Sequence, residues 1–118
     1  YGAGKVVATV CHGPVCLEQC VKSDGTPLVK GLNVTGFSCS EEAALSYTVP
    51  WVIENKFKEL GGNYSKGGDW TSHIEIAGNL LTGQNPQSSE ELAHAVVETL
   101  PELRRARRGA PFFFCCAA

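Results

Sequence analysis

The amino-acid sequence predicts an α/β layered fold with a mostly parallel sheet, and three observations lead to this prediction. Residues 5–10 form a short β-branched run with almost no polar alternation, as expected of a strand that is buried on both faces. A helical pattern follows this strand directly. Further strand and helix patterns then alternate along the chain, which is the order typical of α/β proteins.

The first half of the chain is expected to hold two helices and three strands. After the strand at 5–10, residues 14–21 predict a helix with a proline in its first turn, where a missing N–H is tolerated. Two apolar runs within 28–37, separated by a Lys-Gly pair, predict a strand pair, and 33–37 is the better strand. Residues 40–45 predict a short helix.

A clearer helix pattern follows in the middle of the chain. Thr48 is positioned to cap it, Pro50 fits its first turn, and Gly61 with Gly62 would end it. One apolar face of this helix would contain Val49, Val52, Ile53, Phe57 and Leu60.

The C-terminal part predicts a hairpin and a last helix. Residues 73–77 alternate, a Gly-Asn pair turns, and 80–82 return. A capping box from Ser88 to Glu91 would begin the helix, and Pro101 would close it. The expected buried stripe of this helix is Leu92, Ala95, Val96, Thr99 and Leu100.

Composition indicates one globular domain with an atypical tail. Of the 118 residues, 43% are apolar and 19% are charged, which is the balance of a folded domain and not of a disordered chain. We expect residues 1–100 to form the domain. Residues 101–118, with four arginines and then a Phe-rich run, are expected to be a disordered tail. Because the chain contains no methionine, we expect it to be part of a longer protein.

Charge and cysteine content exclude several classes of protein. The net charge of −2 gives no argument for a nucleic acid or membrane partner, and no apolar run approaches the length of a membrane-spanning helix. The six cysteines are interpreted as reduced thiols of a cytoplasmic protein, with Cys16 and Cys20 buried on a helix. No spacing fits a zinc site. Cys39 would be a resolving thiol for Cys11 if the two are close.

The segment Val10-Cys11-His12-Gly13-Pro14 carries the chemistry. A strand that turns abruptly into a helix, with cysteine at the turn, is a nucleophile elbow. The turn requires a strained backbone at Cys11, and Gly13 makes room beside it. The helix N-terminus would stabilise a thiolate, and His12 could act as general base or acid. The alternative interpretation is a buried structural cysteine beside a chance histidine.

A set of further motifs extends this segment into a family resemblance over residues 4–100. The chain resembles the PfpI-like superfamily (class I glutamine amidotransferase-like), and is most similar to its glyoxalase III and heat-induced chaperone branch. The motifs that carry the resemblance are Val10-Cys11-His12-Gly13-Pro14, Gly25–Gly31, Val34–Phe37, Glu41-Glu42, Val49-Pro50-Trp51, Gly62-Asn63-Tyr64, Trp70, His73 and Thr82–Ser89.

The resemblance implies a fold and a set of site residues. The fold would be a flavodoxin-like layered sandwich. Cys11 would be the nucleophile and His12 the adjacent histidine of a triad. The triad acid of this branch follows the Thr-Gly-Phe strand, so Glu42 is the first choice and Glu41 the second. No cofactor and no metal are expected.

This chain departs from the family pattern at its N-terminal side. Family members are longer there, and the additional part supplies the first sheet strands, part of the oxyanion hole and a second glutamate beside the cysteine. We therefore expect the chain to be the C-terminal part of such a domain, either in a homodimer or in association with an N-terminal segment.

Three functions are compatible with the sequence. The first is a glutathione-independent glyoxalase, a lyase of the D-lactate dehydratase class, whose partner is a small 2-oxoaldehyde such as methylglyoxal. The second is a stress-response holdase chaperone or redox-sensing thiol protein. The third is a non-catalytic truncated remnant. A glyoxalase would lose its activity in Cys11→Ala, whereas a holdase would still suppress client aggregation.

Other residues are interpreted as structural. His73 is expected to be a satisfied core or edge histidine, and His94 a surface partner of Glu90. The loop at 84–86 is expected to be a turn. Trp51 and Trp70 are expected to be packing residues, although Trp70 could form the wall of a pocket.

Overall fold

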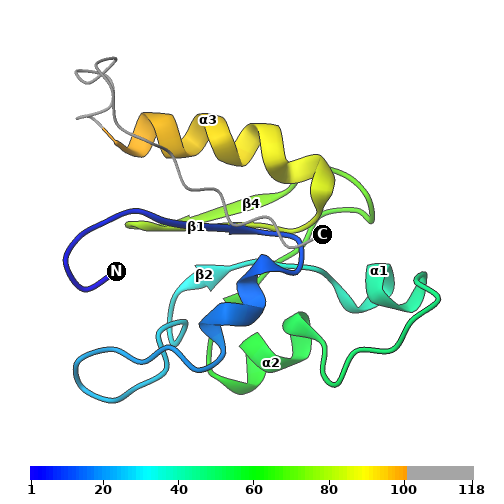
Figure 1. The fold of residues 1–118 in the computed structure, drawn as a ribbon, viewed down its shortest axis with the longest axis horizontal. Coiled ribbons are helices and arrows are strands. Elements are labelled where there is room, and N and C mark those ends of the chain that lie inside the picture. The colour runs from blue at the N-terminus through cyan, green and yellow to red at the C-terminus, as the bar shows by residue number, and fades with distance from the viewer. Residues whose placement is uncertain (101–118) are drawn as a thin grey trace.

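A computed structural model describes residues 1–100, and the predicted tail 101–118 lies outside the described part. The order of elements is that of an α/β protein (Figure 1). The elements are β1 (Val7–Val10), η1 (Gly13–Leu17), β2 (Asn33–Val34), α1 (Cys39–Ala43), α2 (Ile53–Glu59), β3 (Asn63–Tyr64), β4 (Ile74–Ala77), β5 (Leu80–Gly83), η2 (Pro86–Ser88) and α3 (Ser89–Thr99).

The main sheet has the strand order β1-β5-β4 and is mixed. Strand β1 pairs parallel with β5, in a register that places Val7 opposite Leu80. Strands β4 and β5 form the predicted antiparallel hairpin. A second, small parallel pair joins β2 to β3. The prediction of an α/β fold is confirmed, and β3 is a strand that the sequence did not predict.

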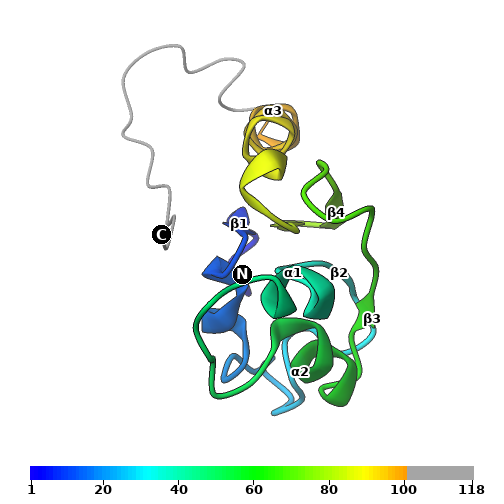
Figure 2. The ribbon, with the colours of Figure 1, turned by 90° about the vertical axis from the view of Figure 1, so that its right-hand side faces the viewer.

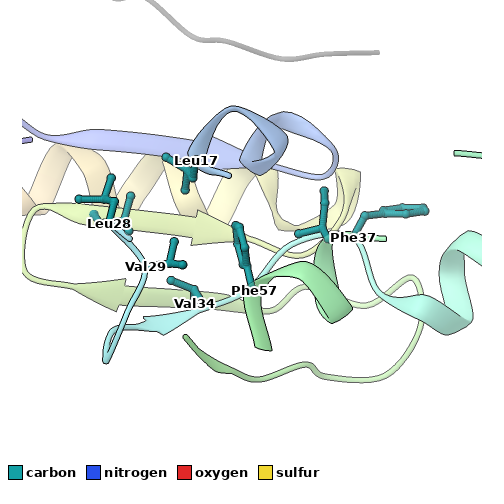
Figure 3. Packing of buried hydrophobic residues seen from close by; sticks show 8 residues of the cluster. Leu17, Leu28, Val29, Val34, Phe37 and Phe57 are labelled. Carbon is teal, nitrogen blue, oxygen red and sulfur yellow. The ribbon is translucent and has the colours of Figure 1, made fainter. Parts of the chain in front are cut away.

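Two apolar layers enclose the main sheet, and β5 contributes to both. All four residues of β5 are buried. Because successive strand residues face opposite sides, Leu80 packs with the cluster around Phe57, and Leu81 packs with the cluster under α3. Figures 1 and 2 show α3 on one face of the sheet and α1 and α2 on the other. Figure 3 shows the first cluster, whose buried members are Leu17, Leu28, Val29, Val34, Phe37, Ile53, Phe57 and Leu80.

The segment after β1 differs from the predicted helix at 14–21. It is a 3-10 helix, η1, that ends at Leu17, with hydrogen bonds of the i to i+3 type such as Val15 N to His12 O (3.0 Å). The side chain of Cys16 is exposed, so the prediction that it is a buried apolar residue was wrong. Cys20 is half-buried and packs against the core.

The predicted strand pair within 28–37 is reduced to the two residues of β2. Leu28 and Val29 are buried as expected, but they lie in a turn in which Lys30 N donates to Pro27 O (3.1 Å). Gly31 continues this turn with φ of 74°. The apolar character of Leu28 and Val29 therefore reflects burial under α2 and not strand pairing.

Two predicted helix starts also need correction. Helix α2 begins at Ile53, after an extended Val52, so Thr48 and Pro50 lie before it. Helix α3 is present with Leu92, Ala95 and Val96 buried, but Ser88 does not cap it. The Ser88 hydroxyl donates instead to Asn85 Oδ1 (2.8 Å) in the preceding turn. None of the helices in the described residues has the length and apolar composition needed to cross a membrane.

Gly36 is expected to be sensitive to substitution because side chains of α2 and η1 pack directly against it. A Cβ at this position would lie 2.7 Å from Ile53 Cγ2 and 3.3 Å from Pro14 Cγ. We expect Gly36→Ala to lower the free energy of unfolding by about 1–3 kcal/mol, the usual range for overpacking. Urea denaturation measures this change. Gly2→Ala is the matched control, since nothing lies within 4 Å of its Cβ, and equal midpoints for the two variants would contradict the prediction.

Candidate active site

Cys11 occupies the strained turn that the elbow motif predicts. It follows β1 directly, precedes η1 and has a backbone φ of 61°, a value that residues other than glycine rarely adopt. Its backbone N–H donates to Gly83 O, and its carbonyl accepts from Phe37 N, each at 3.0 Å. These two bonds tie Cys11 to β5 on one side and to the segment after β2 on the other. The strain is therefore maintained by tertiary contacts and not by the local sequence.

His12 lies between the thiol of Cys11 and the carboxylate of Glu42. Its Nδ1 is 3.4 Å from Cys11 Sγ, and its Nε2 is 2.8 Å from Glu42 Oε2. Because an ionised carboxylate can only accept, this contact places a proton on Nε2. The lone pair of Nδ1 then faces the thiol, which is the orientation a general base requires.

The structure brings Glu42, the first of the two acidic candidates, to His12. Both carboxylates belong to α1, whose start is fixed by a capping box between Ser38 and Glu41. Adjacent residues of a helix point about 100° apart, so only one of the two can face the histidine. Glu42 faces His12 and is largely buried. Oε1 of Glu42, its other oxygen, is also buried, and it makes no hydrogen bond to any residue from 1 to 100.

Glu41 points into a different, fully buried network. Its Oε1 accepts from Trp70 N (2.9 Å) and Asn85 Nδ2 (2.8 Å), and its Oε2 accepts from Ser38 N (3.1 Å) and Ser38 Oγ (2.8 Å). Burial by itself raises the pKa of Glu41, but the hydrogen bonds from Trp70, Asn85 and Ser38 outweigh it and hold that pKa below its usual value. The carboxylate is therefore kept ionised inside the protein.

The lowered pKa of Glu41 predicts a stability change in acid. A carboxyl whose pKa is lower in the folded state than its ordinary 4.5 stabilises the fold above that value, and this contribution is lost as pH falls through the folded pKa. We expect the free energy of unfolding to fall below about pH 4.5, and to fall less steeply in Glu41→Gln. Denaturant titrations from pH 7 to pH 3 measure both curves. Parallel curves for the two proteins would contradict this assignment.

Two aromatic side chains, Phe37 and Tyr47, lie beside His12, and a third, Trp70, packs against Phe37. The ring of Phe37 packs on His12 with a centroid separation of 4.2 Å, and Trp70 meets Phe37 edge-on at 5.6 Å. Tyr47 is exposed and lies 6.4 Å from His12. Desolvation, followed by the charges of Glu42 and Cys11, raises the pKa of the Tyr47 phenol. Sequence reasoning missed Tyr47, because nothing in its exposed loop marks it.

The remaining histidine and cysteine candidates lie in separate contacts. Nε2 of His73 is 2.7 Å from Ser65 Oγ and 3.7 Å from Glu75 Oε1, so it is a satisfied, half-buried histidine as predicted. The thiol of Cys39 donates to Asn55 Oδ1 (3.4 Å). Burial, then the charge of Glu54, raises the pKa of the Cys39 thiol, which disfavours the thiolate that a resolving cysteine needs.

The side chains of the predicted turn at 84–86 have structural contacts. Gln84 and Asn85 are fully buried, and Gln84 Oε1 accepts from Gly67 N (2.9 Å), so these side chains hold neighbouring loops together. His94 is exposed. Over residues 1–100, no three His, Cys, Asp or Glu side chains are grouped so that they could hold a metal ion.

Comparison with known proteins points to one family, although no family model matches the chain. The chain is 33% identical over 107 residues to the probable glutathione-independent glyoxalase hsp3104 of Schizosaccharomyces pombe, an alignment of 85% of this chain and 48% of that protein. It is 32% identical over 108 residues to glutathione-independent glyoxalase HSP31 of Saccharomyces cerevisiae, covering 85% of this chain and 46% of that protein.

A solved structure gives the same result. The crystal structure of glyoxalase III from Candida albicans matches with a TM-score of 0.76 and 32% identity, over 82% of this chain and 44% of that one. The chain thus spans about half the length of the relatives it matches. In sequence and in fold, the chain belongs to the PfpI-like family, in the branch that contains the glutathione-independent glyoxalases.

Proposed function

We propose that this chain carries the thiol site of a glutathione-independent glyoxalase, which converts methylglyoxal or a similar 2-oxoaldehyde to the corresponding 2-hydroxy acid. The observation that supports this function best is the continuous path from Cys11 Sγ through His12 to Glu42, with contacts of 3.4 and 2.8 Å. The names of the relatives support this reaction, and the order of thiol, imidazole and carboxylate supports the roles of nucleophile, base and orienting carboxylate that we propose for them.

The first step forms a carbon–sulfur bond. Nδ1 of His12 takes the proton of the Cys11 thiol, and the thiolate adds to the aldehyde carbon of the substrate. The aldehyde oxygen then takes up a proton, which gives a hemithioacetal. Glu42 stabilises the positive charge that His12 carries during this transfer.

The second step is an internal oxidation and reduction. His12, neutral again after the first step, removes the proton from the hemithioacetal carbon while the ketone oxygen takes up a proton, which gives an enediol. The hydroxyl on the first carbon then gives up its proton and the second carbon receives the proton held by His12, so the first carbon is oxidised to a thioester and the second is reduced to a secondary alcohol. No external oxidant is required. Water then cleaves the carbon–sulfur bond, which releases the 2-hydroxy acid and restores the Cys11 thiol. With methylglyoxal the product is D-lactate, as in the D-lactate dehydratase class of lyases.

The test measures methylglyoxal consumption and D-lactate release by the purified chain without glutathione. We expect turnover by the chain and none by Cys11→Ala. Turnover that is equal in the two proteins would overturn the thiol mechanism. Absence of turnover in a folded chain would overturn the proposal for this chain alone. In that case, suppression of client aggregation that persists in Cys11→Ala would favour a holdase.

A further inference from the structure

The side chain of Trp70 lies at the aromatic edge of the site and has no part in the mechanism above. Its ring packs edge-on against Phe37 at 5.6 Å, and Phe37 packs on His12 at 4.2 Å. Trp70 is nevertheless 40% exposed. A large, part-exposed aromatic side chain that is separated from His12 by one packed ring offers apolar surface to a molecule bound at the site.

The backbone of Trp70 is held in an unfavourable conformation. Within residues 1–100, the non-glycine residues with positive φ are Cys11 at 61° and Trp70 at 59°. Bulky side chains rarely adopt this region, and such strain is concentrated at functional sites. The same kind of strain is therefore found at the nucleophile and at a residue of its aromatic surroundings.

Buried polar groups fix Trp70 in this conformation. The N–H of Trp70 donates to Glu41 Oε1 (2.9 Å), and Asn85 Nδ2 donates both to that oxygen (2.8 Å) and to Thr71 O (2.7 Å). Glu41 and Asn85 are each 0% exposed. A buried carboxylate is costly unless it is fully hydrogen-bonded. Glu41 accepts four hydrogen bonds, and two of them come from Trp70 N and Asn85 Nδ2 and so hold the segment at Trp70.

We propose that Trp70, positioned by Glu41, is a specificity residue of this site that favours 2-oxoaldehydes with an aromatic substituent, such as phenylglyoxal, over methylglyoxal. This inference rests on the proposed function and adds the class of substrate. Tyr47, 6.4 Å from His12, is a second exposed ring at the same site. The planar apolar substituent of such a substrate would pack against these rings while the aldehyde carbon of the substrate lies at Cys11.

Steady-state kinetics with phenylglyoxal and methylglyoxal test the proposal. We expect Trp70→Ala to lower kcat/KM for phenylglyoxal roughly tenfold, mainly through KM, since it loses an aromatic contact. The value for methylglyoxal should change less than about threefold, because its methyl group offers little surface. Trp70→Phe should restore most of the loss. Trp51→Ala is the matched control, a half-buried tryptophan beside Lys56, and it should affect both substrates equally. Equal losses for both substrates in Trp70→Ala would overturn the proposal.

A variant of Glu41 tests the positioning role. Glu41→Gln should raise KM for phenylglyoxal while kcat for methylglyoxal stays within about twofold, at a temperature where circular dichroism shows the variant folded. An unchanged preference for phenylglyoxal in this folded variant would show that Glu41 does not position Trp70.

A binding measurement separates this inference from the proposed function. If neither aldehyde is turned over, the glyoxalase proposal fails, and titration of Cys11→Ala with mandelate and with lactate, followed by NMR, still reports the preference. Binding of mandelate roughly tenfold tighter than lactate, lost on the additional Trp70→Ala change, would support the specificity role. Equal affinities for the two acids would overturn it.

Discussion

Replacing Cys11 with glycine is expected to abolish glyoxalase turnover and, at the same time, to make the protein more stable than the Cys11→Ala variant by about 1 kcal/mol. The first effect follows from removal of the thiol that forms the bond to substrate in the proposed mechanism. The second follows from φ of 61° at this position, which costs an L-residue about 1–2 kcal/mol but costs glycine almost nothing. Glycine also gains freedom in the unfolded chain, which offsets part of this difference.

Activity assays and urea denaturation of the two variants measure both effects. Because neither variant has a thiol at position 11, their difference in stability reports the backbone alone. Cys20→Ala is the control for loss of a thiol elsewhere, since Cys20 is half-buried and donates to Cys16 O (3.2 Å). It should retain turnover. A Cys11→Gly variant less stable than Cys11→Ala would show that the turn is not strained.

The adjacent carboxylates of α1 should respond in opposite ways when each is replaced with glutamine. Glu42→Gln removes the negative charge beside His12, and we expect turnover to fall by about 10²- to 10⁴-fold, as for loss of the acid in other triads. Its stability should change by less than about 1 kcal/mol, because an amide oxygen can still accept from Nε2 of His12 and removal of a largely buried charge offsets the cost of an amide N–H₂ in place of the unbonded Oε1. Glu41→Gln instead places an amide N–H₂ against a backbone N–H, of either Ser38 or Trp70, because each carboxylate oxygen of Glu41 accepts from one of these donors.

We therefore expect Glu41→Gln to lower the free energy of unfolding by about 1–3 kcal/mol, the cost of a buried donor left without an acceptor. Its kcat for methylglyoxal should stay close to that of the unmodified chain. Measuring turnover and unfolding for both variants tests the pair. Loss of kcat in Glu41→Gln with little change in Glu42→Gln would show that the acid of the site has been assigned to the wrong residue.

Local signals were sufficient where the pattern and the tertiary structure agree. The β-branched run before Cys11 predicted β1 and the strained turn after it, and alternation predicted the hairpin of β4 and β5. Leu28 and Val29 were misjudged because burial of apolar residues does not distinguish a strand from a turn that packs under a helix. Ser88 was misjudged because its hydroxyl accepts from the N–H groups of His73 and Asn85 and donates to Asn85 Oδ1, in place of accepting from an N–H of the helix.

For the proposed site, the sequence predicted Cys11 and His12, which the structure places in contact, but left the choice between two glutamates open. The choice between Glu41 and Glu42 depends on how α1 is rotated against the sheet, and this rotation is set by contacts with Trp70 and Asn85, far along the chain. Tyr47 could not be predicted, because its proximity to the reactive groups arises only from the path of an exposed loop.

The pairing of β1 with β5 has a consequence for the synthesis of the protein. The N–H of Cys11 bonds to Gly83 O, and β1 has β5 as its partner in the sheet over the described residues. During translation, the cysteine emerges from the ribosome long before the strand that fixes its backbone. The strained turn therefore cannot be stabilised until β5 has followed. Closing the long loop between β1 and β5 costs chain entropy, which slows the pairing of the two strands. The nascent chain thus carries an unconstrained cysteine first, and only the completed sheet converts it into the geometry of the site.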